Sequence, residues 1–88
     1  MKTPVYSGQF KKDYKLAGKR GEDIAELKKI ISELLIGNDL PPKNQDHMLS
    51  GNYRGCRECH INPDWLLIYE VTENEIKLIR TGSHSDLF

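Results

Sequence analysis

The stretch Trp65-Leu66-Leu67-Ile68-Tyr69-Glu70-Val71 decides the fold of this chain. All but one of its residues are apolar, which predicts a central strand of a sheet that is covered on both faces. A turn signal stands on each side of it, Asn62-Pro63-Asp64 before it and Glu73-Asn74 after it. The neighbouring segments 53–61 and 75–81 have a period of two, so we predict two further strands there. The three strands would form an antiparallel meander.

Upstream of the meander, the sequence predicts a short strand and two helices. Residues 3–6 favour a strand, and Ser7 is suited to cap a first helix. Gly37 would end a second helix, whose apolar residues recur at helical spacing: Ile24, Leu27, Ile30, Ile31, Leu34 and Leu35. This order, β-α-α-β-β-β, predicts an α+β fold with a two-helix hairpin packed on an antiparallel β-sheet. We expect residues 1–88 to form a single domain, and the N-terminal strand could pair with the meander.

The composition limits the classes of function. Apolar residues make up 38% and charged residues 30%, which is typical of a folded domain rather than a disordered tail. Thirteen Lys+Arg balance thirteen Asp+Glu, so the total does not indicate a strongly basic nucleic-acid module. No apolar run is long enough to span a membrane, and the N-terminus lacks the apolar stretch of a signal peptide. We therefore expect a cytoplasmic protein.

Positive charge is concentrated near the N-terminus. The first twenty residues contain a single acidic side chain, Asp13, and six basic ones: Lys2, Lys11, Lys12, Lys15, Lys19 and Arg20. A basic segment of this kind can hold phosphates or an acidic partner. It can equally be a helix face that is covered only by solvent.

The segment Cys56-Arg57-Glu58-Cys59-His60 matches C-x-x-C-H, the attachment signature of c-type haem. Haem attachment normally needs export, for which the sequence has no signal. Alternation along the predicted strand places Cys56, Glu58 and His60 on one face, and Arg57 and Cys59 on the other. Cysteines that point apart can neither chelate one metal nor readily form a disulfide. We interpret them as two semi-buried thiols without a cofactor.

The three histidines, His47, His60 and His84, are stronger candidates for chemistry, because histidine gives and takes protons near neutral pH. Two histidines on opposite sides of a phosphodiester can cleave RNA, one by removing the ribose 2′-OH proton and the other by protonating the leaving 5′-oxygen. The nucleophile belongs to the substrate, so the reaction requires no metal and no cofactor. It requires positive charge on the phosphate, which three arginines could supply: Arg54, Arg57 and Arg80.

Two further residues fit the same chemistry. Asp64 follows His60 across a predicted turn and could orient an imidazole or share its protons. Phe88 is an aromatic residue at the C-terminus. It could stack on a nucleobase, which is the usual way in which single-stranded RNA is held.

Three segments together are specific enough to indicate a family. Residues 45–49, 57–69 and 80–88 contain the patterns D-H-x-L, C-H-I-x-P-D and R-x-G-S-H-S-x-L-F, and they resemble the YafQ branch of the RelE/ParE toxin superfamily. Residues 6–13 are similar as well, so the resemblance covers essentially the whole chain. It implies a type II toxin that cleaves mRNA at the ribosome, leaving a cyclic or 3′-phosphate and a 5′-OH.

The resemblance also implies roles for individual residues. The catalytic positions of the family match five residues of this chain: His47, His60, Asp64, His84 and Phe88. Arg80 matches a phosphate contact. Met48 and Ser50 depart from the family pattern, in which proline and lysine are common at these positions. The neutral net charge predicts a weaker grip on free RNA, which would leave more of the positioning to the ribosome.

The family implies a protein partner, because a growth-arresting toxin must be held inactive. We expect a DinJ- or RelB-like antitoxin in a hetero-oligomeric complex, with the basic segment Lys11–Arg20 as a candidate docking surface. The alternative function is that of a ParE-like toxin without nuclease activity, which binds DNA gyrase and would not need the histidines.

Overall fold

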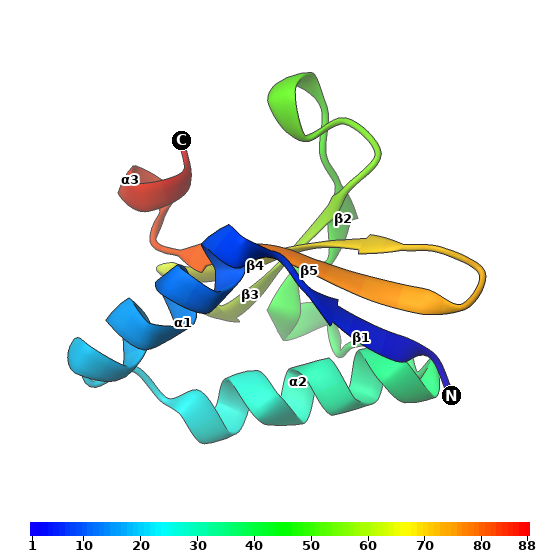
Figure 1. The fold of residues 1–88 in the computed structure, drawn as a ribbon, viewed down its shortest axis with the longest axis horizontal. Helices are drawn as coiled ribbons and strands as arrows, with labels where there is room; N and C mark the ends of the chain where they lie inside the picture. The colour runs from blue at the N-terminus through cyan, green and yellow to red at the C-terminus, as the bar shows by residue number, and fades with distance from the viewer.

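The computed structural model describes residues 1–88, in which two helices cover one face of a five-stranded sheet (Figure 1). The elements in chain order are β1 (Thr3–Tyr6), α1 (Gly8–Lys19), α2 (Ile24–Ile36), the 3-10 turn η1 (Pro42–Asn44), β2 (His47–Met48), the 3-10 turn η2 (Gly51–Tyr53), β3 (Arg57–Asn62), β4 (Trp65–Val71), β5 (Glu75–Gly82) and α3 (His84–Leu87). The predicted α+β class and the predicted order of strand, two helices and three strands are confirmed, and the short strand β2 is an additional element that the sequence does not predict. None of the helices has the length and apolarity that a membrane crossing requires.

The strand order in the sheet is β1-β5-β4-β3-β2, so β4 lies in the centre as its apolar sequence predicts. Strands β2 to β5 pair antiparallel, whereas β1 pairs with β5 in parallel and reaches only as far as Leu78. The N-terminal strand therefore joins the meander, and the sheet is mixed rather than wholly antiparallel. The part of β5 that follows Leu78 has no strand neighbour on that side.

The helices pack on the sheet through their apolar stripes. Phe10 of α1 and Leu27 and Ile30 of α2 belong to one buried cluster with Trp65 and Leu67 of β4. Burying an apolar side chain of this size contributes roughly 1.5–3 kcal/mol. This cluster is therefore the main core, and it fixes the sheet on which the candidate residues stand.

The opposite face of the sheet is covered only in part. Leu66 and Ile68 of β4 pack there against Leu87 of α3, with Tyr53 and Cys56 at the margin. Both α3 and the η2 turn rise from this side of the sheet, away from α1 and α2 (Figure 1). Because residues of a strand alternate between the two faces, this is also the side toward which Glu58 and His60 point.

The strand β3 is shorter than predicted. It starts at Arg57 instead of Tyr53, because the preceding residues form a turn. Gly51 and Gly55 have φ values of 68° and 88°, a left-handed conformation that favours glycine and does not continue a strand. As a result, Arg54 lies in an exposed turn beside the sheet.

The C-terminal segment forms a single-turn helix, α3, which the sequence analysis does not predict. The Oγ atom of Ser83 accepts a hydrogen bond from the backbone N–H of Asp86 at 3.2 Å. In return, Oδ2 of Asp86 accepts one from the N–H of Ser83 at 2.9 Å. This capping box is encoded by the Ser-x-x-Asp spacing, so the signal was present in the sequence.

Candidate active site

Three histidines from three different elements lie on the partly covered face of the sheet. His60 of β3 and His84 of α3 meet edge to face, with ring centroids 5.8 Å apart. His47 of β2 lies directly opposite Glu58 in the pairing of β2 with β3. The structure therefore brings together the three histidines that the sequence analysis singles out, although they are far apart along the chain.

Glu58 connects two of these histidines, and the sequence analysis does not include it in the candidate set. Its Oε1 atom lies 3.5 Å from Nε2 of His47 and 3.7 Å from Nε2 of His60. The residue is only 4% exposed, and Oε2 has no hydrogen-bond partner. Buried polar atoms without a partner are rare, and they are often found where chemistry takes place. The alternation that places Glu58 on the face of His60 could have identified it.

Asp64 contacts His84 rather than His60. Its Oδ1 atom lies 3.3 Å from Nδ1 of the His84 ring and 3.4 Å from the backbone N of the same residue. Asp64 stands in the turn between β3 and β4, where its own N–H donates to Oδ1 of Asn62. Both side chains are largely exposed. A carboxylate in this position can fix the orientation of the imidazole and leave Nε2 free to exchange a proton.

Phe88 lies beside this group of residues. Its ring meets the ring of Tyr53 edge to face, with centroids 5.7 Å apart, and its backbone N–H donates to the carbonyl of His84 at 2.8 Å. Phe88 is nevertheless 65% exposed. An aromatic face that is held in place but remains open to solvent is suited to stack on a base.

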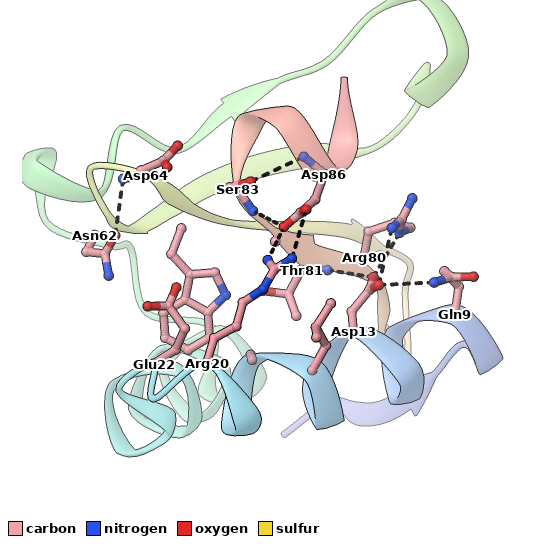
Figure 2. A pocket seen from close by; sticks show the side chains of 14 residues that line it. Gln9, Asp13, Arg20, Glu22, Asn62, Asp64, Arg80, Thr81, Ser83 and Asp86 are labelled. Carbon is pink, nitrogen blue, oxygen red and sulfur yellow. Dashed lines mark hydrogen bonds and ion pairs between the residues drawn. The ribbon is translucent and has the colours of Figure 1, made fainter.

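Arg80 is held by an acidic residue of α1. Its Nε and Nη2 atoms donate to the carboxylate of Asp13 at 2.8 and 3.2 Å, and the N–H of Thr81 donates to the same carboxylate at 3.2 Å (Figure 2). Asp13 is only 8% exposed. These bonds raise the pKa of Arg80 above its usual value. Asp13 therefore fixes the position of Arg80. It also accepts a hydrogen bond from the N–H of Thr81, which lies in the part of β5 that β1 does not reach.

Arg57 has a different position from the one predicted for a phosphate contact. It is paired with Tyr69 across β3 and β4, on the side of the sheet that faces the helices. Its Nε atom donates to Oδ1 of Asp46 at 3.1 Å, and the hydroxyl of Tyr69 donates to the same atom at 2.7 Å. Asp46 directly precedes His47, so this network anchors the segment that carries His47. Of the three predicted arginines, Arg54 alone makes no ion pair.

The two cysteines do lie on opposite faces of the sheet. Cys59 is fully buried under the helices, and Cys56 packs in the smaller cluster on the other side. Burial raises the pKa of Cys59 to about 12, and it raises the pKa of Cys56 as well. Both thiols therefore stay protonated near neutral pH, which makes them poor nucleophiles and poor metal ligands. No group of three or more His, Cys, Asp or Glu side chains is arranged to hold a metal ion.

The sequence and the fold of the whole chain are similar to those of known proteins. Residues 2–88 match a family described as bacterial toxin of type II toxin-antitoxin system, YafQ. A curated relative, the mRNA interferase toxin YafQ of Escherichia coli strain K12, is 47% identical over 85 residues, which cover 94% of this chain and 91% of the relative.

Solved structures of YafQ proteins have the same fold as this chain. The crystal structure of YafQ from Escherichia coli strain BL21(DE3) superimposes with a TM-score of 0.95 at 40% identity, covering 100% of this chain and 99% of the other. The crystal structure of the Escherichia coli DinJ-YafQ complex contains a chain with a TM-score of 0.93 at 42% identity and the same coverage. The protein described here belongs to the YafQ family of bacterial toxins from type II toxin-antitoxin systems.

Proposed function

We propose that the chain is a ribosome-dependent mRNA endoribonuclease in which histidines transfer the protons. The endoribonuclease class follows from the family, since relatives with 47% identity are named mRNA interferase toxins. The observation that supports histidine catalysis is the contact of the His60 and His84 rings, with Glu58 on one side and Asp64 on the other. RNA cleavage without a metal requires one group that accepts a proton and one that donates a proton, and these adjacent side chains can supply both.

The proposed reaction starts with the ribose 2′-OH of the substrate. One histidine removes its proton, and the 2′-oxygen attacks the adjacent phosphorus. The bond from phosphorus to the 5′-oxygen breaks, and a second histidine protonates that oxygen. The products are a 5′-OH and a 2′,3′-cyclic phosphate, which water can hydrolyse to a 3′-phosphate and a 2′-OH. His60 and His84 are the pair whose rings are in contact, and His47 joins them through Glu58.

Positive charge for the phosphate would come from Arg80 and Arg54. Two nitrogen atoms of Arg80 bind Asp13, so Nη1 is the atom that we propose for the phosphate. A guanidinium that is already fixed in place loses little freedom when it binds an anion. Arg54 is exposed and directly follows Tyr53, whose ring contacts Phe88, so it could contact the RNA backbone. We assign Arg57 to the anchoring of His47 through Asp46, because it points to the other side of the sheet.

Phe88 would hold a base of the substrate. Phe88 is largely exposed to solvent, and its ring contacts the ring of Tyr53 edge to face. Stacking of a base on an aromatic side chain contributes roughly 1–3 kcal/mol. Because Phe88 directly follows the short helix that begins with His84, a stacked base would place the neighbouring phosphate close to that imidazole.

We further propose that a DinJ-like antitoxin inhibits the chain in the cytoplasm, where ribosomes are found. The Escherichia coli relative has been crystallised as a DinJ-YafQ complex. In this chain Lys11, Lys12 and Lys15 are exposed on α1 and make no ion pairs, so they are available to an acidic partner. If they contact the antitoxin, changing all three to glutamine should weaken its affinity, and an unchanged affinity would reject this surface.

The test of the proposed function is expression of the chain alone, beside a variant in which His60→Ala and His84→Ala are combined. The 5′ ends of cellular mRNA are then mapped. New ends with a 5′-OH at defined codon positions, absent with the variant, would support the proposal. Growth arrest that persists in a folded double variant would contradict it and favour a toxin that binds DNA gyrase. In that case replication would stop instead of translation.

A further inference from the structure

The short C-terminal helix α3 begins with His84 and is followed directly by Phe88, and both residues belong to the proposed functional set. It has four residues, and a single helical turn is not stable in water by itself. Leu87 is its only buried side chain. The position of α3 on the sheet must therefore be fixed by a small number of contacts, and these contacts decide where His84 and Phe88 stand.

The shortest of these contacts is an ion pair with the end of α1. Arg20, the residue at the C-terminal end of α1, donates from Nη1 to Oδ2 of Asp86 at 2.6 Å and from Nη2 to Oδ1 at 3.4 Å. Figure 2 shows the guanidinium of Arg20 pointing to Asp86 from below, with Ser83 on the other side of the carboxylate. Two parallel contacts of this kind fix an orientation as well as a distance.

Asp86 is confined by its other neighbours. Its Oδ2 atom also accepts the N–H of Ser83 at 2.9 Å. A Cβ atom added to Gly82 would lie 3.0 Å from Oδ2 and 3.0 Å from Cβ of Asp86, so the side chain is folded tightly against the last residue of β5. The bond to Arg20 and the bond to Ser83 hold the pKa of Asp86 at about 2. The carboxylate is therefore charged throughout the physiological pH range, and its neighbours hold it in one position.

Arg20 has no other ion-pair partner. Arg20 belongs to the basic N-terminal segment that was expected to bind an acidic partner, but its charge is paired within the molecule. Asp64 also contacts α3, through longer distances of 3.3 and 3.4 Å to His84. Two residues outside α3 therefore contact it, and the contact of Arg20 with Asp86 is shorter than the contact of Asp64 with His84.

We propose that the pair of Arg20 and Asp86 positions α3, so that His84 meets His60 and Phe88 meets Tyr53. Arg20 and Asp86 are then positioning residues for RNA cleavage, and neither touches the substrate. This inference rests on the proposed function for its effect on cleavage. Its structural part, the attachment of α3 to α1, can be tested without any cleavage.

The test uses four variants and one control. Arg20→Met removes the cation, Asp86→Asn keeps an acceptor for Ser83 but removes the charge, and a double variant combines the two. Arg20→Lys restores the charge without the fork of the guanidinium. Lys29→Met is the matched control, because Lys29 is an exposed basic residue of α2 without an ion pair.

The first readout is cleavage of mRNA on ribosomes under single-turnover conditions. We expect Arg20→Met and Asp86→Asn each to lose roughly ten- to a hundredfold in rate at saturating toxin, because a small displacement of a catalytic group has effects of this size. The concentration for half-maximal rate should change by no more than about twofold, since substrate binding is not removed. The double variant should be no slower than the slower single variant. Arg20→Lys should recover only part of the rate, because it restores the charge without the two parallel contacts. The control should match the wild type.

The second readout is the amide exchange rate of Phe88, whose N–H donates to the carbonyl of His84. We expect faster exchange at Phe88 in Arg20→Met and in Asp86→Asn. The melting temperature should change little, because exposed ion pairs contribute little to global stability. This readout does not require an active toxin. If the wild type failed to cleave mRNA, the proposed function would fail, while exchange at Phe88 would still decide whether the pair holds α3.

Two results would overturn the inference. Loss of cleavage in Arg20→Met together with full cleavage in Asp86→Asn would show that Arg20 acts directly on RNA. Unchanged cleavage and unchanged exchange in both variants would show that the pair has no positioning role.

Discussion

The carboxyl group of Glu58 lies 3.7 Å from Nε2 of His60, buried and with one oxygen atom unpaired. A buried polar atom that makes no hydrogen bond lowers stability. The same group stands between two imidazoles, where it can accept a proton or stabilise a protonated ring. Features that lower the stability of the folded state are retained mainly at functional sites. Glu58 is therefore expected to act in catalysis.

Glu58→Gln keeps the shape of the side chain and removes its ability to exchange a proton. We expect the free energy of unfolding to stay equal or to rise, because an ionisable group is costly to bury. Cleavage should fall by roughly a hundredfold, as for the loss of a proton-transfer group. Urea unfolding and a cleavage assay measure the two effects, with Glu73→Gln in an exposed turn as the control. Lower stability with full cleavage would make Glu58 a structural residue.

The pH dependence of cleavage should separate the roles of His60 and His84. With one histidine as base and the other as acid, the wild-type rate should give a bell-shaped profile. His60→Gln and His84→Gln should each lower the rate by roughly 10²–10⁴-fold, and the residual activity should lack one limb of the bell. The variant that loses the acidic limb identifies the base. A complete bell in both variants would mean that other groups transfer the protons.

Asp13 is expected to contribute to stability through Arg80 and Thr81. Asp13→Asn places an amide that donates hydrogen bonds among three groups that also donate, the side chains of Arg80 and Gln9 and the N–H of Thr81. We expect a loss of about 1–3 kcal/mol, because a buried donor is left unpaired. The urea midpoint should fall at constant slope, whereas Asp39→Asn, an exposed control without a partner, should not shift it. An unchanged midpoint would show that Arg80 keeps its place without Asp13.

Much of the fold could be predicted because local signals agreed with one another. The apolar run of β4 indicated a central strand, and Gly37 ends α2 with a φ of 91°. The predicted start of β3 was wrong because Gly51 and Gly55 adopt left-handed conformations, which a strand pattern does not reveal. The parallel pairing of β1 with β5 depends on how α1 and α2 return the chain to the sheet, and no local signal encodes it.

The candidate site could be predicted in its residue types but only in part in its contacts. The chemistry of histidine singled out three residues that the fold does bring to one face. The partners of Arg80 and Arg57 are Asp13 and Asp46. The first of these ion pairs joins segments at opposite ends of the chain, and the second joins β3 to the residue that precedes β2. Whether an arginine is free for a phosphate depends on such long-range pairs, so sequence patterns alone could not separate the three arginines.

The buried thiol of Cys59 gives the stability of the protein a dependence on alkaline pH. The thiol has an ordinary pKa of 9.0, and burial raises the pKa to about 12 in the folded chain. Between these values the unfolded state has lost the proton and the folded state has kept it. The stabilising contribution is therefore complete below about pH 9 and is lost as the pH rises toward about 12.

The prediction is a melting temperature that falls as the pH rises above about 9, with a smaller slope in Cys59→Ala. This variant starts from a lower stability because it leaves a cavity, so the slopes and not the absolute values are compared. Tyr69, whose pKa is raised mainly by burial and then by its bond to Asp46, acts in the same direction and remains in both proteins. Cys56→Ala is the control and should keep most of the slope. An equal slope in Cys59→Ala and in the wild type would assign the alkaline loss to Tyr69 and not to the thiol.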